Sequence, residues 1–297
     1  MITINRIHHG DCHDLLSFVE PGTVDLTVFS PPYDDLRGYG GGQYDLPRLG
    51  DQLYRVTKVG GVVAMVIADQ TKNHRKSMTT FRTIVDWVDR VGWNLWECLI
   101  LHRHGKPGPY WNYRFRTDHE YIPVFFKGNK PRVFHKGELT VPCRYSGRHS
   151  NPVKSRQPDG TYEVGKTFDI PEEKCIGSVW RIDNFPNQRD TLSIQHPATF
   201  AEQVPSRLIR ALTNEGDLVL DPMAGSGTTA VAALQLGKRF IGMEIHDKYC
   251  KIARRRVADT TPSLPGYSPQ GRTKWDLTPH TTVSTGHTAV STSGAGG

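Results

Sequence analysis

The stretch that decides the fold is Asp221-Pro222-Met223-Ala224-Gly225-Ser226-Gly227-Thr228-Thr229. A turn and a short apolar run at residues 216–220 precede it and predict a buried strand, and the helix formers of residues 230–237 follow it. A strand that ends in a glycine-rich turn and opens a helix is typical of nucleotide sites. Glycine lets a ligand approach the backbone, and the first amides of the helix face it.

Three ligands are compatible with such a turn. A P-loop carries a lysine after its last glycine, where this chain has Thr228, so a nucleoside triphosphate is disfavoured. A dinucleotide fingerprint, G-x-G-x-x-A, fits residues 225–230, and Glu244 follows at about the expected 20 residues. However, Asp221 places a carboxylate at the strand end, which repels pyrophosphate but tolerates the amino and sulfonium groups of S-adenosylmethionine. The turn alone favours S-adenosylmethionine and leaves a dinucleotide open.

Composition and charge narrow the class of protein. The 297 residues, 37% of them hydrophobic, are enough for one large domain or a domain with an inserted smaller one. The formal net charge of +7 is consistent with an acidic partner without proving one. The five cysteines form no C-x-x-C pair, so we expect reduced thiols. No segment has the length of a signal peptide or a membrane span, so we expect a cytoplasmic protein.

A second motif, Ser30-Pro31-Pro32-Tyr33, follows a β-branched run at residues 24–29 that predicts another buried strand. The two prolines end that strand and stiffen its exit, so Ser30 and Tyr33 are held at its carboxyl edge, where open α/β sheets bind ligands. Further strands are predicted at residues 2–7, 62–67, 93–101, 120–126 and 239–244, and helices at 14–19, 45–57, 77–91, 200–214 and 247–257.

The middle of the chain has a different texture, because residues 127–195 are irregular and residues 127–156 are strongly basic. Such a segment fits contacts with the DNA backbone, and a solvated loop is the alternative. The candidates for DNA contact are Lys127, Lys130, Arg132, Lys136, Arg144, Arg148, Lys154 and Arg156. Residues 110–116 interleave aromatic side chains with arginines, which suits either DNA contact or core packing.

Together the two motifs resemble those of the bacterial DNA amino-methyltransferases. Their catalytic motif reads Asp/Asn/Ser-Pro-Pro-Tyr/Phe, and their cofactor motif reads Asp-Pro-Phe-x-Gly-Ser-Gly-Thr-Thr. The resemblance covers residues 5–257 outside the basic insert, and the catalytic motif comes first, as in the β group of that family. One departure is Met223, which replaces the usual phenylalanine and can supply a similar apolar wall.

The resemblance implies an α/β, Rossmann-like methyltransferase that uses S-adenosylmethionine. Its parts would be a catalytic part at residues 1–126, a target-recognition insert at 127–195, a cofactor-binding part at 196–258 and a disordered tail at 259–297. The cofactor would be held by Asp11, Phe200, Asp221, Pro222, Met223, Gly225, Ser226, Gly227, Thr228, Thr229 and Glu244. No metal is expected, because the histidines at positions 102, 104 and 119 have no acidic or cysteine partner at suitable spacing.

The same resemblance assigns roles to the catalytic tetrapeptide. The Ser30 hydroxyl and the Pro31 carbonyl would accept the two N–H groups of an exocyclic amine, freeing the nitrogen lone pair from the ring. Tyr33 would stack on a base rotated out of the duplex, and the ring of Pro32 would support it. Serine at the first position narrowly favours cytosine N4 over adenine N6, because it is commoner among the cytosine enzymes of the family.

We therefore expect methyl transfer to an amino group in double-stranded DNA, within a restriction–modification setting and close to the bacterial nucleoid. Analogy with the family also allows a homodimer. The alternatives are an RNA or protein-amide methyltransferase, a DNA-binding protein without catalytic activity, and a dehydrogenase that uses the glycine turn. The recognition sequence depends on loop contacts that no pattern reveals.

Overall fold

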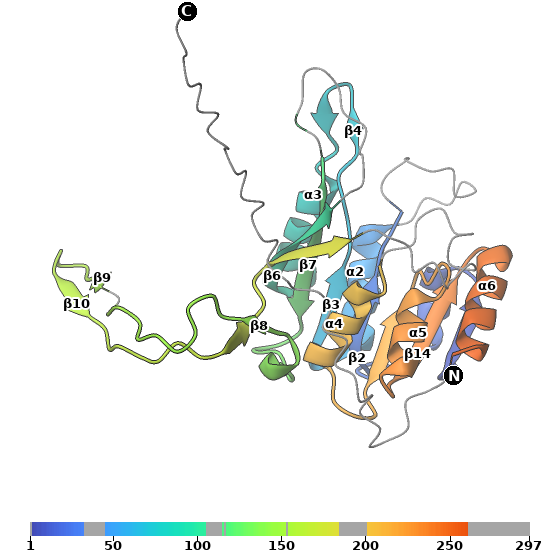
Figure 1. Cartoon of the computed structure of the whole chain (residues 1–297). Helices are drawn as coiled ribbons and strands as arrows, with labels where there is room; N and C mark the ends of the chain where they lie inside the picture. The colour runs from blue at the N-terminus through green and yellow to red at the C-terminus, as the bar shows by residue number, and fades with distance from the viewer. Residues whose placement is uncertain are drawn as a thin grey trace, which may run out of the picture. The chain divides into compact units, whose positions relative to one another are not determined.

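The computed structural model describes residues 2–32, 45–104, 115, 117–152, 154–183 and 201–260. An eight-stranded sheet forms its centre, in the order β1-β14-β13-β2-β3-β7-β6-β12 (Figure 1). The strands are β1 (Arg6–His9), β2 (Val24–Phe29), β3 (Thr57–Met65), β6 (Asn94–His104), β7 (His119–Phe126), β12 (Val179–Asp183), β13 (Leu218–Asp221) and β14 (Arg239–Glu244). β1, β14, β13, β2 and β3 run parallel, whereas β7 is antiparallel to both of its neighbours. The parallel strands therefore end at one edge of the sheet.

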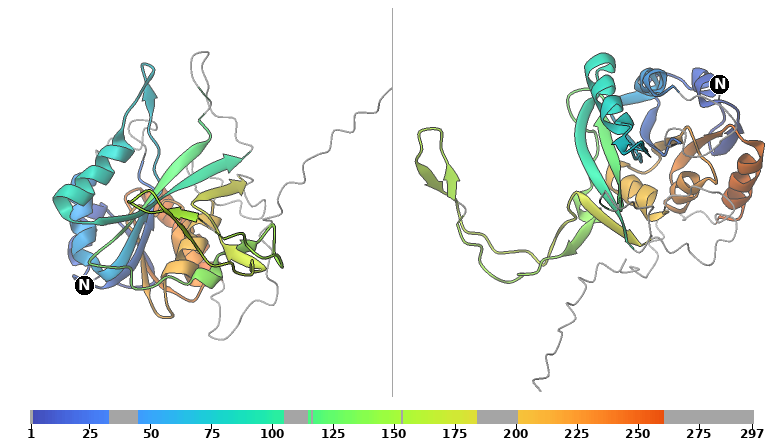
Figure 2. Two further views of the ribbon diagram at one scale, coloured as in Figure 1. Left: turned by 90° about the vertical axis from the view of Figure 1, so that its left-hand side faces the viewer. Right: turned by 90° about the horizontal axis from the view of Figure 1, so that it is seen from above.

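Helices cover both faces of this sheet (Figure 2). They are α1 (Cys12–Leu15), α2 (Leu46–Val56), α3 (Thr79–Asp86), α4 (Gln203–Leu212), α5 (Thr228–Gln235) and α6 (Asp247–Ala258), with short turns η1 (Leu16–Phe18), η2 (Trp87–Val91) and η3 (Lys136–Glu138). One buried cluster joins the sheet to α4, α5 and α6, and a second joins it to α2 and the short turns η1 and η2.

Strand β3 shows why the sequence reads as an unbroken apolar run. Val62 and Ala64 belong to the cluster under α4 and α5, whereas Val63 and Met65 belong to the cluster under α2. Successive side chains of a strand point to opposite faces, so a strand covered on both sides must be apolar at every position. The α/β fold predicted from the sequence is confirmed.

Two predicted strands, residues 24–29 and 239–244, are confirmed to the residue. The predicted helix at residues 77–91 is α3 followed by the π-helical turn η2. The expectation of irregular structure up to residue 195 is wrong for β12, which pairs in parallel with β6. Trp180 and Ile182 are buried while Val179 and Arg181 are exposed, and this alternation is a strand signal.

Within the basic insert, short strands pair into antiparallel ribbons that extend away from the sheet (Figure 1). β8 (Thr140–Pro142) pairs with β11 (Glu173–Cys175), and β9 (Lys154–Arg156) pairs with β10 (Tyr162–Val164). A separate small hairpin consists of β4 (Thr71–Lys72) and β5 (Arg75–Lys76). The tail from residue 261 onward lies outside the described residues. None of the helices described combines the length and apolarity needed to span a membrane.

Candidate active site

The glycine-rich turn connects β13 to α5, as predicted. Asp221 ends the strand, Thr228 begins the helix, and Gly227 between them has a φ of +83°, a left-handed conformation that favours glycine. Every residue of the turn is buried except Met223, which is half-buried. The first amides of a helix have no acceptor within it, so the start of α5 offers donors to a ligand at the carboxyl edge of the sheet.

Glu244 ends the neighbouring strand β14 and fastens this turn. Its Oε2 accepts the backbone N–H of Gly225 at 2.8 Å, and its Oε1 accepts the N–H of His246 at 2.8 Å. The side chain is buried, and a carboxylate has about four acceptor positions, so both oxygens retain capacity for a ligand hydroxyl. Glu244 therefore shapes the turn and can also accept hydrogen bonds from a ribose.

Asp221 is a second carboxyl group in the same place. Its Oδ1 accepts the N–H of Met223 at 3.0 Å, and the residue is 2% exposed. Burial, with a smaller contribution from nearby Glu244, raises the pKa of Asp221 to about 7, against hydrogen bonds from Thr229 and the Met223 amide that lower it. Two buried carboxyl groups beside the turn repel a phosphate and attract a cation.

The proline-rich motif leaves the sheet beside this turn. Ser30, Pro31 and Pro32 follow β2 directly, and β2 is the neighbour of β13 in the sheet. The Thr229 hydroxyl at the start of α5 donates to the Val28 carbonyl at 3.4 Å, two residues before Ser30. The structure thus brings the two motifs to one sheet edge.

Two predicted site residues, Tyr33 and Phe200, lie outside the described residues.

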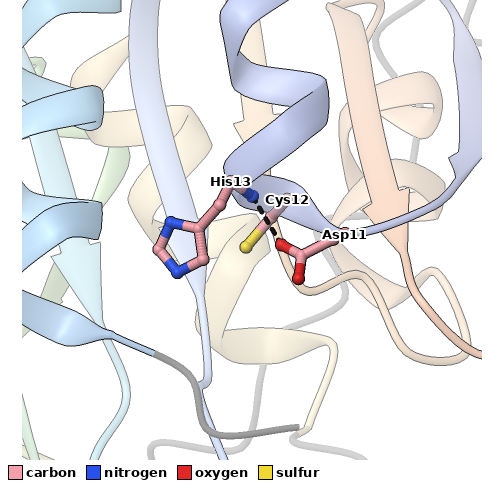
Figure 3. A group of neighbouring side chains, drawn as sticks. All are labelled: Asp11, Cys12 and His13. Atoms are coloured by element: carbon pink, nitrogen blue, oxygen red, sulfur yellow. Dashed lines mark hydrogen bonds between the residues drawn. The ribbon is translucent and has the colours of Figure 1, made fainter.

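Asp11 reaches the same edge from β1. The N–H of Gly10 donates to the Glu244 backbone carbonyl at 3.0 Å, which places Asp11 next to the end of β14. The Asp11 Oδ1 accepts the N–H of His13 at 2.7 Å and so caps α1 (Figure 3). Asp11 thus lies at the same sheet edge as the glycine-rich turn, and its role in holding a cofactor stays a prediction.

The side chains of Asp11, Cys12 and His13 have ligand atoms within 4.8 Å of one another, a grouping that could hold a metal ion (Figure 3). A metal binds cysteine as the thiolate, but burial, reinforced by Asp11, raises the pKa of Cys12 to about 12. His13 Nδ1 is already bonded to the Gln52 side chain at 2.7 Å. The chemistry fits a capped turn that anchors α1 to α2 better than a metal centre.

Two of the eight basic candidates make contacts inside the protein. Lys127 donates to the Tyr54 carbonyl at 2.7 Å, and burial lowers its pKa. Arg132 forms ion pairs with Asp25 and Asp217. Sequence reasoning missed this role, because Asp25 is the partner of Arg132 only through the fold. The remaining candidates are all exposed: Lys130, Lys136, Arg144, Arg148, Lys154 and Arg156.

The β9–β10 ribbon has two chemically different faces. Arg156 lies opposite Tyr162, and Lys154 lies opposite Val164. Cross-strand partners and alternate residues share a face of a ribbon, so these four side chains share one face. Ser155 and Glu163 are cross-strand partners and take the other face. One face is therefore basic with an aromatic ring, and the other carries an acid.

The motifs do not include Arg256, which also contacts the turn. It lies in the last turn of α6, is 6% exposed, and donates to the Ser226 carbonyl at 2.6 Å. Three consecutive arginines, residues 254–256, occupy this part of the sequence. The sequence could identify the inward one only if the rotation of α6 against the turn were known.

Comparisons with known proteins agree with this geometry. A family profile described as DNA methylase matches residues 24–255. The type II methyltransferase M2.DpnII of Streptococcus pneumoniae is 51% identical over 254 residues, covering 84% of this chain and 88% of its own.

Two solved structures share the fold. PvuII DNA methyltransferase, described as cytosine-N4-specific, is 19% identical and superposes with a TM-score of 0.65, covering 86% of this chain and 87% of its own. A Thermus thermophilus protein, described as a putative DNA modification methylase and solved in complex with S-adenosyl-L-methionine, is 24% identical with a TM-score of 0.57, covering 87% and 97%.

Proposed function

The chain belongs to the N6/N4 DNA methylase family, and from this premise we propose which residues carry the reaction and which base receives the methyl group. The turn from Asp221 to Thr229, with Glu244, holds S-adenosylmethionine. The motif from Ser30 to Tyr33 holds an exocyclic amino group of a base rotated out of duplex DNA. The observation that carries this proposal is the parallel pairing of β13 with β2, since it places the end that leads into the glycine-rich turn beside the end that leads into Ser30.

The groups beside the turn fit this cofactor. The carboxyl groups of Asp221 and Glu244 are both buried, which disfavours the pyrophosphate of a dinucleotide and favours a ligand with cationic groups. Glu244 keeps acceptor positions for the two ribose hydroxyls while it holds the amides of Gly225 and His246. These buried carboxyl groups therefore disfavour the alternative that the turn binds the dinucleotide of a dehydrogenase.

When bound, the cofactor supplies an electrophilic methyl group on a sulfonium. The residues of the chain have to make the amine a nucleophile and align it. The Ser30 hydroxyl and the Pro31 carbonyl accept its two N–H bonds, so the nitrogen lone pair points away from the ring. The amine nitrogen would take that methyl group as its bond to sulfur breaks, and the proton that the nitrogen loses would pass to solvent. Positioning supplies most of the rate enhancement in such a transfer, and no covalent enzyme intermediate is needed.

We propose cytosine N4 as the target, on the serine at position 30. The test is mass spectrometry of nucleosides from duplex DNA incubated with the protein and S-adenosylmethionine. We expect N4-methylcytosine. N6-methyladenine alone would overturn the choice of base, and methylation of RNA or protein with none on DNA would overturn the substrate. Ser30→Ala should lose turnover and retain cofactor affinity, whereas lost cofactor affinity would contradict the role given to Ser30.

The basic face of the β9–β10 ribbon is the proposed DNA contact. Lys154 and Arg156 are exposed on one face with Tyr162, so they can meet phosphates while the ring reaches a sugar or base. The double variant Lys154→Ala/Arg156→Ala should weaken DNA binding and reduce the slope of log K against log[salt] by about 2. Ser155→Ala, on the opposite face, is the matched control and should change neither. An unchanged salt slope in the double variant would exclude this face.

We further propose that the protein acts on the chromosome in the cytoplasm, as part of a restriction–modification pair, and that two copies associate. Sedimentation of the purified chain tests the last point, and a monomer at all concentrations would refute it.

A further inference from the structure

The end of α6 carries three consecutive arginines with three different environments. Arg254 Nε donates to the Ile7 carbonyl of β1 at 3.0 Å. Arg255 is exposed and pairs with Asp259 at 3.8 Å. Arg256 is 6% exposed and points at the cofactor turn. Because the three side chains are chemically identical, different effects of substituting them would reflect their different positions in the fold.

One guanidinium nitrogen of Arg256 contacts the turn itself. Its Nη1 is 2.6 Å from the Ser226 carbonyl oxygen, 3.2 Å from the Ser226 hydroxyl and 3.3 Å from the Thr228 hydroxyl. A buried guanidinium is strongly unfavourable unless hydrogen bonds replace its hydration. Here oxygens of the glycine-rich segment provide that replacement. The position of Arg256 is therefore energetically tied to the conformation of the turn.

A second contact fixes the same two elements together. A Cβ built on Gly227 would lie 2.9 Å from the Cβ of Ala253, which is one helical turn before Arg256 in α6. Ala253 is fully buried. The backbone of the turn thus rests directly on α6, and Arg256 holds the carbonyl immediately before Gly227.

Two side chains of opposite charge, Glu244 and Arg256, therefore hold the backbone of two adjacent residues of the turn. Glu244 accepts the N–H of Gly225, and Arg256 donates to the carbonyl of Ser226. Together these bonds orient two peptide groups, 224–225 and 226–227, just before α5 begins. Hydrogen bonds that involve a charged partner are about twice as strong as neutral ones, so they resist rotation of the peptide planes.

We propose that Arg256 is a positioning residue for the cofactor turn. By fixing the Ser226 carbonyl, it holds the backbone of residues 226–228 in the conformation that receives S-adenosylmethionine, without touching the cofactor. The proposal rests on the proposed assignment of the cofactor to this turn. Arg256 also lies outside the sequence motif and one residue beyond the segment matched by the family profile.

The test compares Arg256→Met, Arg256→Lys and the control Arg255→Met in the full chain. Calorimetry with S-adenosyl-L-homocysteine measures affinity, and urea unfolding measures whether each variant is folded. Loss of one charged hydrogen bond predicts an affinity about tenfold or more lower for Arg256→Met. We expect a smaller loss for Arg256→Lys, which keeps one charged donor, and none for Arg255→Met. The KM for S-adenosylmethionine should rise in parallel, while kcat at saturation changes much less.

Several outcomes would overturn the proposal. A folded Arg256→Met variant with unchanged affinity would show that the contact only stabilises the protein. If Arg256→Met does not fold, Arg256→Lys provides the test. Normal cofactor affinity together with reduced stability in Arg256→Lys would likewise show that the contact only stabilises the protein. An equal loss in Arg255→Met would assign the effect to net charge. Failure of the unmodified protein to bind S-adenosyl-L-homocysteine would instead refute the cofactor assignment.

Discussion

Replacing Asp221 with asparagine should remove a charge that the fold accommodates at a cost in stability. Burial raises the pKa of Asp221 from its usual value of 3.8 to about 7. Between these values the folded protein keeps a proton that the unfolded chain has released, so stability falls as pH rises. From about pH 5 to pH 8 the loss attributable to this one group is about 3 kcal/mol.

Asparagine has nearly the same shape and can still accept the Met223 N–H, but it does not titrate. From pH 5 to pH 8, the free energy of unfolding of Asp221→Asn should therefore rise by about 3 kcal/mol relative to that of the unmodified protein. Urea unfolding followed by tryptophan fluorescence measures both proteins at each pH. Groups that do not interact with Asp221 titrate alike in the two proteins and cancel in the difference. A difference that does not depend on pH would refute the reasoning.

The same substitution should weaken the cofactor site. An ionised Asp221 attracts the cationic groups of S-adenosylmethionine, so affinity of the unmodified protein should rise from pH 6 to pH 8. At pH 8 the asparagine variant should bind at least about tenfold more weakly, because it lacks the charge that attracts the cationic groups of the cofactor. A variant that is more stable at pH 8 and binds equally well would show that Asp221 does not face the cofactor.

Three further predictions concern residues around the site. Gly227→Ala should destabilise the protein by about 2 kcal/mol, because its φ is +83° and its Cβ would lie 2.9 Å from that of Ala253; an unchanged urea midpoint would contradict this. Arg132→Met should cost about 2 kcal/mol of stability by leaving buried carboxylates short of a partner, whereas Lys130→Met should not, as the same unfolding assay would show. Cys12, with a pKa near 12, should react with iodoacetamide about a thousandfold more slowly at pH 8 than in urea, as peptide mass spectrometry would measure.

The elements predicted best are those whose sequence signal comes from burial alone. Residues 24–29 and 239–244 are buried on both sides of the sheet except at Arg239, so their apolar runs coincide with β2 and β14. β12 escapes prediction because its short alternation, from Val179 to Ile182, stands inside a segment whose composition is otherwise irregular. The strand signal is only four residues long, and the irregular composition of the flanking sequence obscures it.

The basic residues show what a sequence cannot separate. Lys130 and Arg132 are two positions apart and equally suited to a phosphate, yet Arg132 pairs with carboxylates on β2 and just before β13. Arg255 and Arg256 are adjacent, yet one is solvated and the other holds the turn. In each pair the difference arises from partners far away in the chain, which composition and spacing do not record.

The joining of the two motifs follows from strand order. β13 inserts between β14 and β2, so the strand that ends in Asp221 has the Glu244 strand on one side and the Ser30 strand on the other. The chain can therefore place the Ser30 motif near its start and the glycine-rich turn near its end without separating them in space. Within the long connection between the motifs, the β8–β11 and β9–β10 ribbons are separate from this sheet, so they can extend outward and differ in chemistry from face to face. We expect that residues in these ribbons can change while the distance between the two motifs stays fixed by the sheet.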